Sequence, residues 1–107
     1  MKNSELTVLQ PSADTVGQDE FANLARALGH PHRIAILRFL MHQEACFCGE
    51  IVDVLPVAQS TVSQHLKKLK DAGWIEGEID RPRVCYCVNS DTVERFQKLF
   101  ASLLTQK

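Results

Sequence analysis

The chain has 107 residues, of which 45% are hydrophobic and 23% are charged, the composition of an ordinary soluble domain. This length argues against a multidomain enzyme, and a dimer interface would supplement the modest core that a chain of this size buries. No apolar run approaches the roughly 18 residues that a membrane span needs, and the first residues lack the features of a signal peptide. We therefore expect a cytoplasmic protein without a membrane partner.

Residues 1–17 show no sustained apolar period, so we predict a mobile N-terminal arm followed by one domain over residues 18–107. From Asp19 onward, apolar residues recur at helical spacing until Gly29, which is a good helix terminator. Pro31 suits the start of a second helix that is apolar around much of its circumference, as expected of a central helix.

Two short helices are predicted next. Residues 51–55 form the first of them, and Pro56 ends it. The second begins almost at once, because residues 59–61 supply polar capping side chains, and Gly73 ends it. Two short helices joined by a tight turn are typical of a helix-turn-helix unit.

Residues 74–79 and 84–88 are rich in strand-forming residues on either side of a polar turn, which indicates a β-hairpin. Ser90 or Asp91 can cap a final helix with an apolar stripe. The predicted fold is therefore mainly α, a winged helix-turn-helix with about five helices plus a β-hairpin wing.

The formal charge of −1 neither indicates nor excludes a nucleic-acid partner, so the placement of the charges decides. The fourth predicted helix has no acidic residue between Gln59 and Lys70. Short polar side chains near the start of a recognition helix read base edges, whereas Lys and Arg hold phosphates. We accordingly predict DNA binding by Gln59, Ser60, Thr61, Ser63, Gln64 and Lys67, and by Arg81 and Arg83 at the hairpin tip. His65 is interpreted as a packed or capping side chain.

Four segments together resemble the ArsR/SmtB family of metal-responsive repressors: LGHPHRI (28–34), CFCGE (46–50), QSTVSQHL (59–66) and DAGWI (71–75). The resemblance extends over about residues 19–104. It implies a homodimer held by the first and last helices, which binds palindromic operator DNA without a required cofactor and is released by an inducer.

In the arsenic-sensing branch of that family, a Cys-x-Cys pair stands where Cys46 and Cys48 stand here. A third cysteine, present in many of those proteins, is replaced here by the apolar Ile51 or Val52. The resemblance therefore implies a thiophilic inducer, and As(III), Sb(III) or another soft metal ion is chemically suited because soft thiolates select soft metals and metalloids. The zinc site of other branches is missing, since residues 91–107 contain no histidine.

A second pair, Cys85 and Cys87, is assigned from strand geometry. We expect residues 45–48 to pair with residues 84–88, and alternation along both strands then puts all four thiols on one face. One soft ion could be held there by three thiolates drawn from both segments, so Cys46, Cys48, Cys85 and Cys87 are all candidate metal ligands.

Two other hypotheses belong to different classes of function. The cysteine pairs could form a redox switch in which oxidation produces a disulfide or a persulfide. Enzymatic activity is disfavoured because no phosphate-binding loop, zinc-protease motif or recognisable nucleophile motif is present. His30, His32 and His42 could ligate a metal, but capping or solvent exposure is the preferred interpretation.

Overall fold

The structure is a computed structural model that describes residues 13–43, 46–50, 55–80 and 83–104. Within these ranges there are four helices and three strands, namely α2 (Ala13–Ala27), α3 (Pro31–Met41), β1 (Phe47–Glu50), α4 (Gln59–Ala72), β2 (Ile75–Asp80), β3 (Arg83–Val88) and α5 (Ser90–Leu104). The mainly helical winged helix-turn-helix is confirmed. Most of the helix predicted over residues 51–55 lies outside the described ranges. No helix in the described part of the chain has the length and apolar character needed to cross a membrane.

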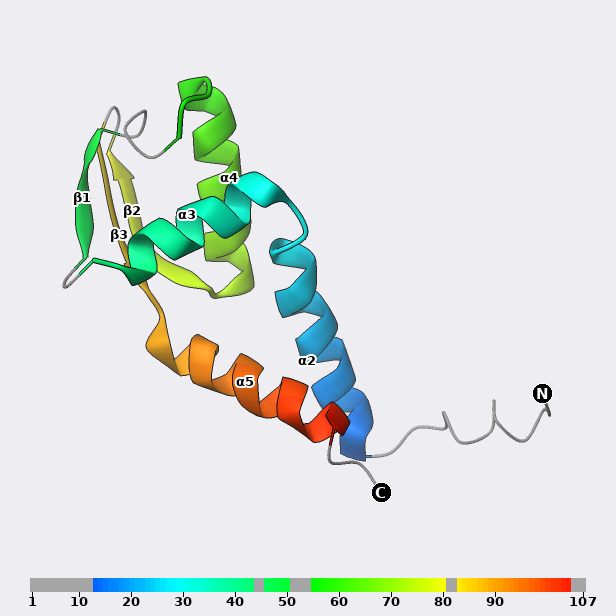
Figure 1. The fold of residues 1–107 in the computed structure, drawn as a ribbon. Helices are drawn as coiled ribbons and strands as arrows, with labels where there is room; N and C mark the ends of the chain where they lie inside the picture. Colours follow the sequence, from blue (N-terminus) through cyan, green and yellow to red (C-terminus); the bar gives the residue numbers. More distant parts are fainter. Residues whose placement is uncertain (1–12, 44–45, 51–54, 81–82, 105–107) are drawn as a thin grey trace.

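The molecule has a sheet at one end and a pair of helices at the other (Figure 1). Helices α3 and α4 lie beside the sheet, whereas α2 and α5 extend away from it and approach each other at their far ends (Figure 1). The elements predicted to contact DNA are thereby separated from the helices that the family resemblance assigns to the dimer interface.

The wing contains a third strand in addition to the predicted hairpin. The sheet order is β1-β3-β2 and both pairings are antiparallel, so β3 is central. Phe47 lies opposite Tyr86 and Cys48 opposite Cys85, which confirms the expected pairing of these two segments. The charged residues of the three strands are mostly acidic: Glu50, Glu76, Glu78, Asp80 and Arg83.

The core lies where α3 and α4 meet the sheet. Helix α4 buries Val62, Leu66 and Leu69, whose spacing places them on one helix face. Tyr86 of β3 is only 1% exposed and belongs to the same hydrophobic core. The spacing of apolar residues in the sequence therefore predicted the buried side of α4. The opposite side of the helix is free to make contacts outside the domain.

Helix α2 begins earlier than predicted, so residues 13–17 of the expected N-terminal arm are helical. Residues 1–12 lie outside the described ranges. A Cβ at Gly17 would lie 3.4 Å from Leu99 of α5, which shows that the two helices pack closely there. Stacking of Phe21 on Phe96, with ring centroids 4.9 Å apart, extends this contact. Packing against α5 therefore outweighs the low helix propensity of glycine.

The capping residues of two helices differ from the prediction. Asn89 caps α5, since its Oδ1 accepts hydrogen bonds from the backbone N–H groups of Asp91 and Thr92 at 3.1 and 3.2 Å. Helix α4 begins after Ala58 without a side-chain cap, so residues 59–61 form its first turn. Gly73, with φ of 97°, ends α4 in the left-handed conformation that glycine adopts without strain.

Candidate DNA-binding and thiol site

The outward face of α4 carries the polar and basic side chains that the sequence assigned to DNA. Ser60, Gln64, Lys67 and Lys68 are all exposed and recur at helical spacing opposite the buried residues. Lys67 donates a hydrogen bond from Nζ to Asp71 at 3.1 Å, but both side chains are well exposed and the ion pair is correspondingly weak. This face can thus offer hydrogen-bonding groups near the helix start and positive charge further along.

Other predicted DNA contacts are placed differently. Ser63 is 6% exposed and lies among the core residues, so we leave it out of the proposed reading set. Gln59 and Thr61 are half-buried. Arg81 falls outside the described residues, and Arg83 is the first residue of β3.

The four cysteines form two disulfides between β3 and the β1 segment. Cys46 is bonded to Cys87 and Cys48 to Cys85, with Cα–Cα separations of 4.4 and 4.1 Å. These separations are near those of directly opposed residues in a non-hydrogen-bonded antiparallel pair. The expected alternation is present, because Tyr86, between the two wing cysteines, is buried while Cys46, Cys48 and Cys85 are exposed. All four sulfur atoms are therefore gathered on one side of the sheet.

The opposite side of β1 contacts the helices. The ring of Phe47 meets Phe39 of α3 edge-on, with centroids 5.0 Å apart. Beside the Cys46–Cys87 disulfide is a groove of about 530 Å³, lined also by Leu40, Met41, Gln43, Val88, Ser90, Val93 and Glu94. A chemical change at the sulfurs would therefore occur on a strand that packs directly against α3.

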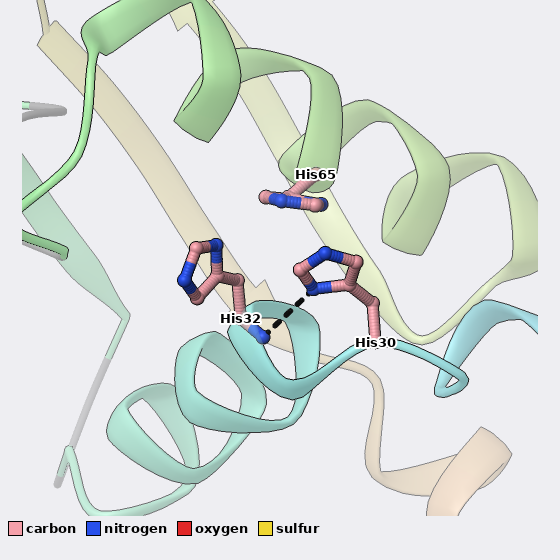
Figure 2. Close-up of side chains that lie close together, drawn as sticks. All are labelled: His30, His32 and His65. Atoms are coloured by element: carbon pink, nitrogen blue, oxygen red, sulfur yellow. Dashed lines mark hydrogen bonds between the residues drawn. The ribbon is translucent and has the colours of Figure 1, made fainter.

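Three histidines meet where α3 packs against α4 (Figure 2). The His30 Nδ1 accepts a hydrogen bond from the backbone N–H of His32 at 3.0 Å and caps α3, which is one of the two roles that the sequence favoured. The His65 ring lies 4.5 Å from that of His30 and 5.4 Å from that of His32, between centroids. Burial lowers the pKa of His65, and the positive charge that His30, Arg33 and His32 can carry lowers it further.

The grouping of these histidines was not predicted. His65 is packed, in agreement with the sequence interpretation, but its partners are the two other histidines. The sequence holds them in two motifs 33 or more positions apart, and nothing in the local spacing shows that α3 and α4 bring them together. The packing of the two helices was needed to find the cluster.

The fold agrees with comparisons to known proteins. A family model described as a helix-turn-helix domain matches residues 28–78. The HTH-type transcriptional regulator YgaV of Escherichia coli is 32% identical over 90 residues, which cover 84% of this chain and 86% of that protein. The HTH-type transcriptional repressor SmtB of Mycobacterium tuberculosis is 47% identical over 68 residues, or 64% of this chain and 50% of that one. The chain belongs to the ArsR/SmtB family of transcriptional regulators.

A solved structure supports the ArsR/SmtB assignment at the level of the fold. The homodimeric winged helix-turn-helix DNA-binding domain of a possible ArsR-family regulator from Mycobacterium bovis has a TM-score of 0.61 and 20% sequence identity. That alignment covers 91% of this chain and 90% of the other. The relatives named above are regulators, a non-enzymatic class, in keeping with the sequence interpretation. The helix-turn-helix match includes Cys46 and Cys48 but ends before Cys85 and Cys87.

Proposed function

We propose that this ArsR/SmtB-family protein is a homodimeric transcriptional repressor that binds double-stranded operator DNA and is released by chemistry at its four cysteines. The observation that carries the proposal is the pair of disulfides joining the β1 segment to the central strand of the wing. A change in the state of these sulfurs acts on a strand that belongs to the DNA-binding unit.

The DNA contacts in this proposal come from the exposed face of α4 and from the wing. Ser60 and Gln64 would read base edges, while Lys67 and Lys68 would hold phosphates. Arg81 and Arg83 would reach the backbone from the wing tip. The near-neutral charge of the whole chain does not oppose this arrangement, because phosphate attraction acts over about a Debye length.

The dimer in this proposal forms through α2 and α5. Phe100 and Leu103 of α5 are 49% and 53% exposed and lie three residues apart, so they are neighbours on one face of the helix. The related Mycobacterium bovis domain is homodimeric. A twofold partner on α5 would cover these residues and would place two copies of α4 on successive turns of a palindromic operator.

The first candidate trigger is oxidation of the dithiols, favoured by the disulfides of the structure. A peroxide reacting with one cysteine pair would accept two electrons and two protons from the thiols. Its O–O bond would break to give an alcohol and water, or two waters from hydrogen peroxide, while an S–S bond forms. The new bond would fix β1 on β3, and the contact between Phe47 and Phe39 would pass the constraint to α3.

The second candidate trigger is a thiophilic ion such as As(III) or Sb(III), favoured by the position of all four sulfurs on one face. In the reduced protein, three thiolates from both strands could hold one such ion. The wing would then supply the ligand that Ile51 and Val52 do not. The two triggers differ in what reverses them: a reductant alone restores the redox switch, whereas a dithiol chelator is needed to remove a metalloid.

Operator binding by reduced protein, followed by fluorescence anisotropy, tests the proposal. Separate samples would receive hydrogen peroxide, As(III), Cd(II) or Zn(II), and then either a phosphine reductant or a dithiol chelator. Release by peroxide that phosphine reverses supports the redox trigger, and release by As(III) that only the chelator reverses supports the metalloid trigger. The matched control is C46S/C48S/C85S/C87S, which should bind the operator under every condition. Wild-type affinity that none of the reagents changes would reject thiol control while leaving DNA binding intact.

A further inference from the structure

We infer that His30, His32 and His65 form a binding site for a divalent metal of the Zn(II) class, separate from the cysteines. One ring nitrogen from each histidine can be chosen so that all three lie within 4.8 Å of one another. Two of the rings come from the start of α3 and the third from the middle of α4, and the three rings face a common space (Figure 2). The chain has four histidines, so only His42 stands outside the cluster.

The donor set selects the class of metal. Three imidazoles without a carboxylate suit Zn(II), Co(II), Ni(II) or Cu(II) and do not suit Mg(II) or Ca(II), which require oxygen ligands. Tetrahedral Zn(II) with nitrogen ligands at 2.0–2.1 Å needs those nitrogens about 3.3 Å apart. The rings would therefore close by at most about 1.5 Å, a movement that side-chain rotation can supply. A fourth position would remain for water.

Two features of the surroundings bear on this site. The Nδ1 of His32 is buried and has no hydrogen-bond partner among the described residues, so a metal ligand role would satisfy a group that the fold leaves unmatched. Arg33 lies close enough for its charge to act on His65, and this charge opposes any cation. We therefore expect binding weaker than that of a closed structural zinc site.

Metal binding at His30 would remove the cap of α3. A neutral imidazole has a single nitrogen lone pair, and that of His30 already accepts the N–H of His32. A metal bound at Nδ1 uses this lone pair directly. A metal bound at Nε2 requires the ring proton to be on Nδ1, where it points at the backbone N–H of His32 and leaves no acceptor for it. Either arrangement breaks the capping bond, so the His32 amide reports on occupancy.

Occupancy would join α3 to α4 at a residue of the recognition helix. His65 stands next to Gln64, which is exposed, and Leu66, which is in the core. A metal bridge would thus restrict movement of α4 relative to α3. The four cysteines lie on the sheet and share no residue with the histidine cluster, so metal can bind at either site independently of the other.

The test uses untagged full-length protein with both disulfides formed, checked by the absence of thiol reactivity, so that the cysteines cannot bind metal. Titration with Co(II) should give the visible bands of a tetrahedral complex with no thiolate charge-transfer band, and Zn(II) should displace it. His32→Ala and His65→Ala should weaken binding at least about tenfold. His42→Ala is the matched control and should bind as the wild type does. Equal binding by all three variants, or no binding by the wild type, overturns the inference.

A second measurement uses only wild-type protein, so it does not depend on the folding of a variant. Imidazole and amide NMR signals would be recorded during addition of Zn(II) to the same oxidised protein. The rings of His30, His32 and His65 should shift together, His42 should not, and the His32 amide should exchange with solvent faster. A response confined to other residues, or a His32 amide that stays protected while the three rings shift, would contradict the proposed coordination.

Discussion

Gly77 shows how a single residue allows the wing to form. It has φ of 147° and lies opposite Tyr86, and a Cβ there would collide with the Cys85 carbonyl oxygen and lie 2.6 Å from the Tyr86 ring. Only glycine avoids both the steric overlap and the backbone strain.

We predict that Gly77→Ala lowers the free energy of unfolding of the reduced protein by at least about 1–3 kcal/mol. A residue other than glycine held in this backbone conformation costs that much, and the collision of the added methyl group increases the loss. Urea unfolding measures the loss. Gly17→Ala is the control, since that glycine lies within α2 and its added methyl would meet Leu99 at an ordinary 3.4 Å. This control should be neutral or stabilising by up to about 1 kcal/mol. Equal destabilisation by both variants would refute the argument.

The exposed residues of α4 should divide by what they contact. We predict that Ser60→Ala or Gln64→Ala changes the preference at particular operator positions at about 1–3 kcal/mol each. Lys67→Ala should instead weaken binding to all sequences and lower the salt slope by about one. Anisotropy titrations over a set of mutated operators and several salt concentrations separate the two effects. A uniform loss for all three variants would count against placing α4 in the major groove.

At the scale of the elements, the two disulfides are nested, since Cys48–Cys85 lies inside the loop closed by Cys46–Cys87. The loops span sequence separations of 37 and 41 residues, for which chain entropy predicts about 4 kcal/mol from the first bond. The second bond adds much less, because its cysteines are already held together by the first.

We therefore predict that C46S/C87S and C48S/C85S each keep most of the stabilisation that oxidation gives the wild type, and that the quadruple serine variant shows none. Urea unfolding midpoints of oxidised and reduced samples make the comparison. Additive contributions from the two bonds would disprove the nested-loop account.

The sequence predicted those elements whose signals are local. Alternation of apolar residues located both strands of the hairpin and indicated that Cys85 and Cys87 share a face with Cys46 and Cys48. Pro31 and Gly73 marked helix ends correctly. Asn89 was missed as a cap because Ser90 and Asp91 are equally good caps by composition. The histidine cluster could not be found in this way, since it depends on how α3 crosses α4.

At the scale of the whole molecule, Trp74 connects three elements. Its indole Nε1 donates a hydrogen bond to the Leu24 carbonyl at 2.9 Å in the last turn of α2, where carbonyls lack helical donors. Its ring also contacts Phe96 of α5 with centroids 5.1 Å apart. Trp74, the residue just before β2, thus holds α2 and α5 in position.

We predict that Trp74→Phe costs about 1–3 kcal/mol of unfolding free energy, because it leaves the buried Leu24 carbonyl without its donor. Chemical denaturation with tertiary and secondary structure probes would measure the loss. Phe96→Leu serves as the comparison, since it alters the ring contact while keeping the hydrogen bond. Unchanged stability of Trp74→Phe would show that the carbonyl finds another donor.

The ion pair between Glu20 and Arg95 also joins α2 to α5, with two hydrogen bonds at 2.8 and 3.0 Å. The hydrogen bond from Arg95 lowers the pKa of Glu20. The resulting stabilisation is present above the ordinary pKa of a glutamate and is lost as the pH falls through the lowered value. We predict that Glu20→Gln reduces the Tm at neutral pH, that the difference disappears in acid, and that salt diminishes it because both groups are exposed. A difference independent of pH would mean that charge is not the cause.

The unequal charges of the wing affect how the protein would search for its operator. The exposed carboxylates of Glu50 and Glu76 repel phosphates near the strands, leaving the basic face of α4 to attract them. DNA of arbitrary sequence is bound almost entirely through phosphate attraction, so this repulsion weakens that binding, whereas an operator would also make contacts with the side chains of α4 that we propose to read base edges. The acidic strands would thus shorten the lifetime of complexes with non-operator DNA. A small number of protein molecules could then keep one promoter occupied.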